Sequence, residues 1–430
     1  MNHYAESARL LAAARRVTPT GAQTMSKQAA RFVEGAFPAF LEHGEGCRVV
    51  DSDGNPFVDW VMGLGAVTLG YRHPAVDEAI HRQLRDGILF SLPHRLEMDV
   101  AERLVECIPC AQQVRFVKTG SEAAAAAGRV ARMATGRDLV LYCGYHSWHG
   151  DYPVTKAEHP GVPETLGNLA KAFPYNDLER LETLFVAHPS QIAAVMMEPV
   201  LFDEPLPGFL EGVQELCRQH GALLIFDEVL TAFRWARAGA QEYFGIVPDL
   251  ATFGKAMANG MPLACVVGPA SLMKHAWAVS GTFGGECLSL AACHAVLEVY
   301  EKEDVVSALW KAGTKFQNGF NSLAADLALC RGYPIHPRIE FPRGSDPILL
   351  MSLFLQETAT RGLLFHPAGL NVSVAHEEDL VSKTLAGTAE ALGVVRLAIE
   401  EGDVAGHLRG KPMEPALIRA ADAGHGGRGG

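Results

Sequence analysis

Short apolar runs alternate with longer segments of helical periodicity between about residues 110 and 270. The runs are QVRFVKT, DLVLYCG, IAAVMMEP, ALLIFDE, DLATFGK and PLACVVG, which begin at residues 113, 138, 192, 222, 249 and 262. Apolar runs of this length, separated by helices, are typical of βαβ units. The pattern therefore predicts an α/β fold whose central sheet is mostly parallel.

The flanking segments predict further helices and a hairpin. Helical patterns occupy residues 3–16, 74–88, 96–107 and 121–135, and a longer one runs from about 288 to 327. The DSDGN sequence at 51–55 is a strong turn signal between two apolar runs. A smaller mixed segment follows at 330–420, and the Gly-rich end of the chain is typical of disorder.

A chain of 430 residues is longer than one ordinary core needs. We expect a large domain with the mostly parallel sheet and a smaller α/β domain. The predicted boundaries are an N-terminal segment at 1–60 that joins the small domain, a large domain at 61–290, a C-terminal small domain at 291–420, and a disordered tail at 421–430.

Composition narrows the class of protein. The chain is 48% hydrophobic and 20% charged, with a formal net charge of −12, which argues against a nucleic-acid or membrane-surface partner. We expect no signal peptide and no membrane span, because no apolar run approaches about 20 residues. The nine cysteines are scattered, and Cys107 and Cys110 form a single CxxC with no second pair nearby. These features predict a cytoplasmic enzyme.

Polar residues that could take part in catalysis or ligand binding stand just after the apolar runs. Lys255 follows one run, and Asp227 and Glu228 follow another. A solvated lysine and a helix-capping acid would explain each residue alone. Since ligands gather at the carboxyl ends of parallel strands, an amine and a buried carboxylate could instead face one cavity.

Two more strand ends carry candidate ligand-binding groups. Gly120 and Ser121 open an Ala-rich helix, whose N-terminus suits a phosphate, although Gly and Ser are also common caps. Tyr145, His146, Trp148 and His149 follow the strand that ends near Cys143. Aromatic rings there could stack on a flat ring or simply pack. We expect no metal, because Cys143, His146, His149 and Asp151 crowd into one short loop without a second ligand cluster.

Taken together, these groups describe a site for a phosphorylated, flat, cationic heterocycle that is held by an amine. Pyridoxal 5′-phosphate (PLP) fits this description, with a lysine that forms a Schiff base and an acid that pairs with the pyridine nitrogen.

The motifs resemble a known family. VDWVMGLGAVTLGYRHPAV, TGSEA, GYHSWH, MMEP, FDEV, FGK and GTFGGECLSLAA occur in the order found in class III PLP-dependent aminotransferases of fold type I. The resemblance covers about residues 5–400 and is strongest to the glutamate-1-semialdehyde aminomutase branch. It implies a homodimer with active sites at the interface.

The resemblance also implies roles for individual residues. Lys255 would be the Schiff-base lysine and proton shuttle, and Asp227 would hold the pyridine nitrogen protonated. The other implied cofactor contacts are Gly120 and Ser121 at the phosphate, Val229 and Tyr145 on the two ring faces, Glu198 near the phenolic oxygen, His146 in support of Tyr145, and Thr282 at the phosphate of the neighbouring subunit.

Three positions depart from the family pattern. Ser147 stands where the family usually has Gly. The aminomutase branch has an arginine that grips the substrate carboxylate where Lys27 stands here, and a Trp where Leu64 stands. Lysine is a poor substitute for the planar guanidinium fork.

The departures at Lys27 and Leu64 argue against a small amino-aldehyde acid as the substrate. The GAQTMSK segment, with GILFSLPH downstream, resembles a subgroup of aminotransferases that acts on sugars. Such an enzyme would move an amino group from glutamate, or a similar amino acid, to a keto sugar. Some keto sugars of this kind are nucleotide-linked. The product would serve amino-sugar or antibiotic biosynthesis. The alternative is a glutamate-1-semialdehyde 2,1-aminomutase type of transfer within one molecule, which needs no external donor.

Two hypotheses that assign the chain to another class of function have little support in the sequence. A nicotinamide-dependent oxidoreductase would need a G-x-G-x-x-G after an early strand, and GLGAVTLG at 63–70 matches poorly. A non-catalytic binding module of the same fold would have lost Lys255.

Overall fold

The computed structural model describes residues 3–149, 161–341 and 346–414. Contacts between Cα atoms divide the chain into two compact units, one formed by residues 74–306 and the other by residues 1–73 and 307–416. The domain boundaries expected at 60/61 and 290/291 stay predictions. The tail predicted to be disordered, 421–430, lies outside the described residues.

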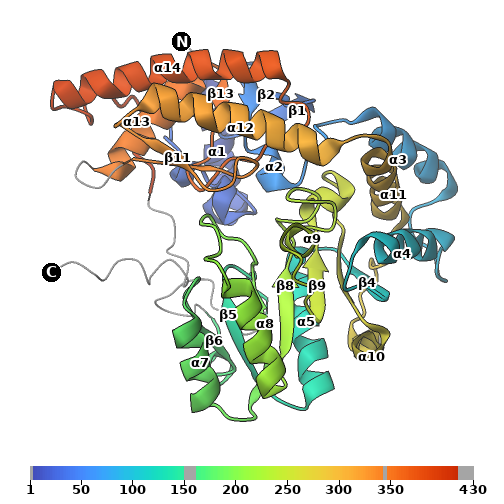
Figure 1. Ribbon diagram of the computed structural model, residues 1–430. Helices are drawn as coiled ribbons and strands as arrows, with labels where there is room; N and C mark the ends of the chain where they lie inside the picture. The colour runs from blue at the N-terminus through green and yellow to red at the C-terminus, as the bar shows by residue number, and fades with distance from the viewer. Residues whose placement is uncertain (1–2, 150–160, 342–345, 415–430) are drawn as a thin grey trace. The chain divides into compact units, whose positions relative to one another are not determined.

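A seven-stranded sheet forms the centre of the unit 74–306 (Figure 1). Its strands, in the order β4-β10-β9-β8-β7-β5-β6, are β4 (Gln113–Val117), β10 (Ala264–Gly268), β9 (Leu250–Phe253), β8 (Leu223–Asp227), β7 (Ile192–Met197), β5 (Leu139–Cys143) and β6 (Ala170–Ala172). Only β10 runs antiparallel to its neighbours. The predicted mostly parallel sheet is confirmed, and the carboxyl ends of β4, β5, β7, β8 and β9 share one edge.

Helices precede, connect and follow the strands of this sheet. They are α3 (Pro74–Asp86), α4 (Arg95–Cys107), α5 (Gly120–Thr135), α6 (Glu164–Gly167), α7 (Leu178–Ala187), α8 (Phe209–His220), α9 (Ala240–Phe244), α10 (Ala270–Met273) and α11 (Cys287–Lys302), with short 3₁₀ turns at Lys255–Ala258 and Lys274–Ala278. The Ala-rich face of α5 is buried against β5, β7, β8, β9 and β10, where small side chains allow close approach. On another part of the unit, α7 and α8 lie side by side (Figure 1).

The long helix expected at 288–327 is two helices. α11 ends at Lys302, and α12 (Val305–Ala324) begins three residues later. The break falls at Glu303, whose backbone is extended, with φ −128° and ψ 143°. Helical periodicity continues across this short polar break, so the sequence pattern did not reveal it.

A smaller sheet, in the order β1-β2-β3-β13, lies in the unit that contains both ends of the described chain. Its strands are β1 (Leu41–Glu45), β2 (Arg48–Asp51), β3 (Pro56–Asp59) and β13 (Leu363–Leu364), and a separate pair is β11 (Leu329–Arg331) with β12 (Arg338–Glu340). The helices are α1 (Ala5–Val17), α2 (Met62–Gly65), α12, α13 (Pro347–Thr360) and α14 (Glu378–Glu400), with 3₁₀ turns at Pro19–Gly21, Met25–Lys27 and Ala29–Arg31. The predicted DSDGN turn joins β2 to β3, and the Asp51 carboxylate accepts hydrogen bonds from the backbone of Asp53 and Asn55.

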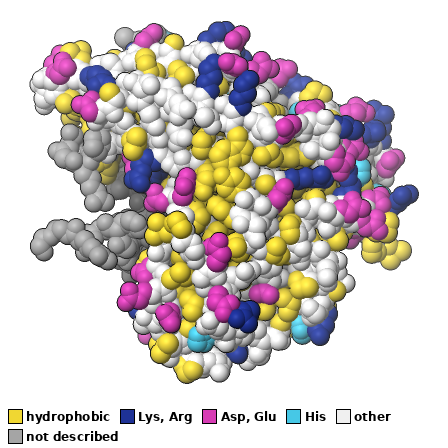
Figure 2. Space-filling model, viewed as in Figure 1, with side chains coloured by type: hydrophobic (Ala, Val, Ile, Leu, Met, Phe, Trp, Pro, Cys, Tyr) yellow, Lys and Arg dark blue, Asp and Glu magenta, His cyan; other side chains and the backbone are white. Residues whose placement is uncertain are grey.

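Among the described residues, no helix combines the length and the apolar character that a membrane crossing requires. Acidic and basic side chains are interspersed over the face drawn in Figure 2. This mixed pattern is that of an ordinary solvated surface.

Candidate active site

The site is built where strands of the central sheet end. Because β4, β5, β7, β8 and β9 finish at one edge, the segments that follow them are brought together. Within the unit 74–306, predicted site residues contact one another or the residue before Lys255. The residues joined in this way are Gly120, Ser121, Tyr145, His146, Glu198, Asp227 and Val229. Five segments separated in the chain therefore meet at this edge of the sheet.

Asp227, the last residue of β8, is buried with 6% of its surface exposed. Its Oδ1 accepts hydrogen bonds from the Thr252 hydroxyl and the Val229 backbone, each at 3.2 Å. Its Oδ2 lies 2.8 Å from Nδ1 of His146. A buried carboxylate held at both oxygens has a defined orientation, which suits a carboxylate that must meet one atom of a ligand.

His146 lies between two hydrogen-bond acceptors. Nδ1 faces the Asp227 carboxylate, and Nε2 lies 3.0 Å from the backbone carbonyl oxygen of Cys143. Burial alone lowers the pKa of this imidazole, but the hydrogen bond and the charge of Asp227, with the charge of Glu198, outweigh burial and raise the pKa. Since each ring nitrogen faces an oxygen atom, the surroundings favour the protonated imidazole over either neutral tautomer.

Glu228 points to a different set of partners from Asp227. Its carboxylate accepts hydrogen bonds from the backbone of Ala240 at 2.7 Å and Gln241 at 2.8 Å, and from the Thr231 hydroxyl. It is fully buried, and burial raises its pKa to about 7. The capping role that the sequence left open between the two acids thus belongs to Glu228, which caps α9, while Asp227 faces the site.

Val229 connects the Asp227 loop to two other parts of the site. A Cβ placed on Gly120 would lie 2.9 Å from Cγ1 of Val229, and one placed on Gly254 would lie 3.4 Å from the same atom. Glycine at position 120 therefore leaves room for Val229 to pack against the start of α5. The same side chain lies beside the residue that precedes Lys255.

Lys255 begins a 3₁₀ turn directly after β9 and is partly buried. Its φ is +44°, in the left-handed region that non-glycine residues rarely adopt. Backbone strain of this kind persists where the surrounding structure imposes it, and it is concentrated at functional sites. This strain is consistent with a place for Lys255 in the site, and its role there stays a prediction.

The start of α5 has the features of an anion site. Thr119 and Glu122 form a capping box in which the Thr119 side chain accepts from the Glu122 backbone N–H. Within the described residues, the backbone N–H groups of Gly120 and Ser121 donate to no protein acceptor. These two donors, at the positive end of a 16-residue helix, suit a phosphate. Together with the carboxyl group of Asp227, they fit a ligand with a phosphate and a protonatable ring nitrogen.

Glu198 follows β7 and fixes the turn that carries Tyr145. Its Oε2 accepts a hydrogen bond of 2.7 Å from the backbone N–H of Tyr145. A Cβ on Gly144 would lie 2.5 Å from the same oxygen, so only glycine allows this close approach. The Tyr145 side chain is 38% exposed. Its stacking on a ligand ring stays a prediction.

Thr282 is exposed, and in the described part of the chain it makes no hydrogen bond to Gly120 or Ser121. Thr282 lies on the segment that precedes α11. In this segment Gly284 lies close to the backbone carbonyl oxygen of Phe116. The predicted contact of Thr282 with a neighbouring subunit stays a prediction.

Lys27 and Leu64 belong to the other compact unit. There the buried carboxylate of Asp59 accepts from the Val61 backbone at 2.7 Å, next to the turn that contains Leu64. Burial raises the pKa of Asp59, and the charge of Lys27 acts on it in the opposite direction. The contact of Lys27 or Leu64 with a substrate stays a prediction.

Sequence reasoning missed two residues of the site. Thr252 lies inside a strand, and an alternating pattern does not mark its hydroxyl as a partner of Asp227. Ser147 was recognised as a departure from a family pattern, but not as a neighbour of Ser121. Only the order of the strands brings either pair together.

Within the described ranges, no group of three His, Cys, Asp or Glu side chains is arranged to hold a metal ion. Asp151, one of the four side chains considered above, lies outside the described residues. Cys107 and Cys110 are free thiols, and burial raises their pKa to about 11 and about 12. Such thiols are poor nucleophiles at neutral pH.

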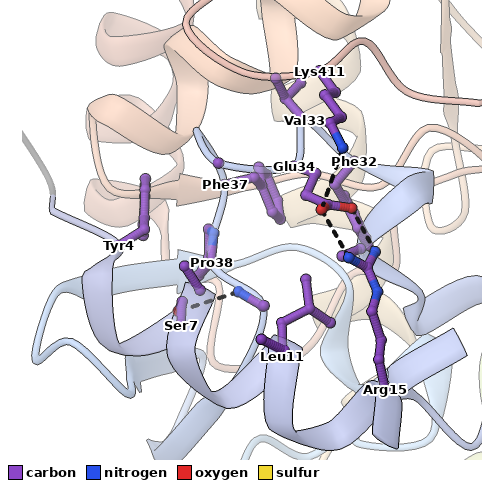
Figure 3. A pocket seen from close by; sticks show the side chains of 15 residues that line it. Tyr4, Ser7, Leu11, Arg15, Phe32, Val33, Glu34, Phe37, Pro38 and Lys411 are labelled. Carbon is purple, nitrogen blue, oxygen red and sulfur yellow. Dashed lines mark hydrogen bonds and ion pairs between the residues drawn. The ribbon is translucent and has the colours of Figure 1, made fainter.

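A separate cavity of about 290 Å³ lies between α1 and the segment 29–39 (Figure 3). Its walls are mainly apolar, with Leu11, Phe32 and Phe37 among them. At its edge, Arg15 donates to both carboxylate oxygens of Glu34, at 2.9 and 2.6 Å. Because Arg15 and Glu34 pair with each other and the other walls are mainly apolar, we do not take this cavity as the candidate active site.

Residues 30–383 match the protein family described as Aminotransferase class-III. The chain is 36% identical over 429 residues to a glutamate-1-semialdehyde 2,1-aminomutase of Roseiflexus castenholzii, with 91% of this chain and 98% of that protein covered. It is 36% identical over 322 residues to a 3-aminobutyryl-CoA aminotransferase of Cloacimonas acidaminovorans, with 73% and 77% covered. The structure of FumI from Sphingopyxis sp. MTA144 in its PLP internal aldimine form matches with a TM-score of 0.86 and 27% identity, covering 92% of this chain and 97% of that one.

Proposed function

This chain belongs to the class III aminotransferase family and is a PLP-dependent transaminase, and from that premise we propose that amine transfer takes place at the strand-end site around Lys255. The observation that carries the proposal is the position of Val229. It packs against Gly120 and beside Gly254, so the loop that follows Asp227, the start of α5 and the residue before Lys255 meet at one side chain.

PLP, when bound, supplies an electron sink for the carbon that loses its proton. The side chains would then divide the work. The N–H groups of Gly120 and Ser121 would hold the phosphate, Val229 and Tyr145 would cover the two faces of the ring, and the Asp227 carboxylate would keep the ring nitrogen protonated. Lys255 would hold the aldehyde carbon through Nζ and carry the proton from one carbon to the next.

His146 and Glu198 would act through other residues. His146 would donate to Asp227 from Nδ1, 2.8 Å from Oδ2, and so hold that carboxylate in its orientation. Glu198 holds the backbone of Tyr145 and so sets where the aromatic ring lies. In this proposal neither needs to touch the ring of the cofactor.

The first candidate reaction is amine transfer within one molecule, of the glutamate-1-semialdehyde 2,1-aminomutase type. The identity of 36% over 91% of this chain to a protein of that name supports it. Such an enzyme would convert its substrate without an external amino donor.

The second candidate is transfer from glutamate, or a similar amino acid, to a keto sugar, including nucleotide-linked ones, in amino-sugar biosynthesis. Lys27 and Leu64 support it, because a lysine holds a substrate carboxylate less specifically than an arginine fork does. The relatives described above support the first candidate better than this one.

One experiment separates the two candidates. The purified chain is loaded with PLP and mixed with glutamate, and the visible absorbance of the bound cofactor is followed in a stopped-flow instrument. Bleaching with release of 2-oxoglutarate supports an external donor. Conversion of glutamate-1-semialdehyde to 5-aminolevulinate without any donor supports the aminomutase. A chain that shows neither reaction and no covalent attachment of PLP to Lys255 would refute the proposed site.

We propose further that the active assembly is a homodimer in which Thr282 reaches the phosphate site of the partner. Thr282 is exposed, and the neighbouring Phe283 side chain is 58% exposed, which is costly for a large apolar group in water. Sedimentation of the purified chain tests the assembly.

A further inference from the structure

Ser147 lies at the start of α5 although it belongs to a different loop. Its hydroxyl and that of Ser121 are hydrogen-bonded to each other, and the Ser147 oxygen also accepts the backbone N–H of Trp148. Ser147 is 8% exposed. A buried hydroxyl from a second loop is therefore present beside the two free backbone donors of Gly120 and Ser121.

The backbone of Ser147 is strained. Its φ is +83°, in the region that glycine adopts without steric cost and that other residues rarely enter. A glycine at this position would adopt the same backbone conformation at a lower steric cost. The backbone conformation therefore does not explain why a serine stands here. The hydroxyl is the group that the glycine would lack.

We propose that Ser147 is an additional ligand of the cofactor phosphate, one that rests on the proposed function of this site. A serine hydroxyl has one donor and two acceptor positions. In the structure one of the Ser121 and Ser147 hydroxyls donates a hydrogen bond to the other. When a phosphate is present, each hydroxyl can turn its hydrogen to a phosphate oxygen, while Ser147 continues to accept from Trp148.

The resulting phosphate site has four donors from two loops. The backbone N–H groups of Gly120 and Ser121 and the Ser121 hydroxyl come from the start of α5, and the Ser147 hydroxyl comes from the loop after β5. The loop after β5 also carries Tyr145 and His146. Phosphate binding would therefore order the loop that presents the stacking ring and the partner of Asp227.

Two variants test this role, Ser147→Ala and Ser147→Gly. Both remove the hydroxyl, but only Ser147→Gly relieves the backbone. The purified full chain is stripped of PLP, and its affinities for PLP, for pyridoxal and for inorganic phosphate are measured by fluorescence titration and by thermal shift. Ser271→Ala, which removes an exposed hydroxyl on α10, is the matched control.

We expect both variants to bind PLP and inorganic phosphate about tenfold more weakly, as for the loss of one hydrogen bond to a charged group. Pyridoxal, which has no phosphate, should bind as it does to the unmodified chain. Without ligand, Ser147→Gly should unfold at the same temperature as the unmodified chain or higher.

Unchanged PLP affinity in both variants would overturn the role of Ser147, and so would an equal loss for PLP and pyridoxal, since that would indicate only a disturbed loop. If Ser147→Ala does not fold, Ser147→Gly decides alone. Failure of the unmodified chain to bind PLP would instead refute the proposed function, so the two failures can be told apart.

Discussion

Nδ1 of His146 lies 2.8 Å from Oδ2 of Asp227, and both side chains are buried. The other nitrogen of the imidazole faces the carbonyl oxygen of Cys143, so both nitrogens meet an oxygen atom. Asp227 raises the pKa of His146 through this hydrogen bond and through its charge. The contact fixes the orientation of the carboxylate that the proposed function places at the ring nitrogen of the cofactor.

Replacing His146 by Asn should reduce kcat by about tenfold to a hundredfold, as is common when a residue that orients a site ligand is removed. The cofactor should still attach to Lys255. Steady-state kinetics with absorbance spectra would show this result. His149→Asn, in the same loop, is the control, and equal losses in the two variants would contradict a specific role for His146.

The His146–Asp227 pair should also make stability depend on pH. The pKa of His146 is raised in the folded chain, so its contribution to stability is complete below the ordinary value of 6.5 and is lost as pH rises through the folded-state value. Chemical unfolding of the PLP-free chain should therefore show a loss of stability above about pH 6.5 that is smaller in His146→Asn. The same slope in both proteins would contradict the ionised pair.

Lys255→Ala should lower turnover by at least about a thousandfold, since the reacting amine is removed. The chain should fold and hold PLP without a covalent bond. Mass spectrometry after borohydride reduction would show the PLP adduct in the unmodified chain and none in the variant. Lys274→Ala, an exposed lysine of the same unit, should retain both adduct and activity.

Gly120→Ala should weaken PLP binding, because the new Cβ would lie 2.9 Å from Cγ1 of Val229. Overpacking of this kind costs about 1–3 kcal/mol, or roughly fivefold to a hundredfold in affinity. Adding Val229→Ala removes the obstructing methyl groups and should restore part of the affinity. An additive loss in the double variant, measured by titration with PLP, would show that the two residues are not in contact.

Glu228→Gln should change how stability varies with pH. The pKa of Glu228 is raised to about 7, so its contribution to stability is complete below its ordinary value of 4.5 and is lost as pH rises through about 7. The unmodified chain should lose more stability between about pH 5 and pH 8 than Glu228→Gln does. Denaturant unfolding at several pH values measures this, with Glu211→Gln on the exposed face of α8 as the control.

The amino-acid sequence by itself determined the α/β class, the mostly parallel sheet and the candidate residues Lys255 and Asp227. It could do so because buried parallel strands are short apolar runs, and a charged residue at the end of such a run is visible in the local pattern. The motifs around these residues were also sufficient to indicate PLP. The break between α11 and α12 was not visible, because helical periodicity continues across it.

Only the tertiary structure decided which of these residues act together. His146 and Asp227 are 81 positions apart, and Ser121 and Ser147 are 26 apart. The division of work between Asp227 and Glu228 likewise depends on where α9 begins. Each of these contacts follows from the order of the strands and from the direction of side chains at one sheet edge. A pattern along the chain specifies strand ends, but it does not specify which strands are neighbours.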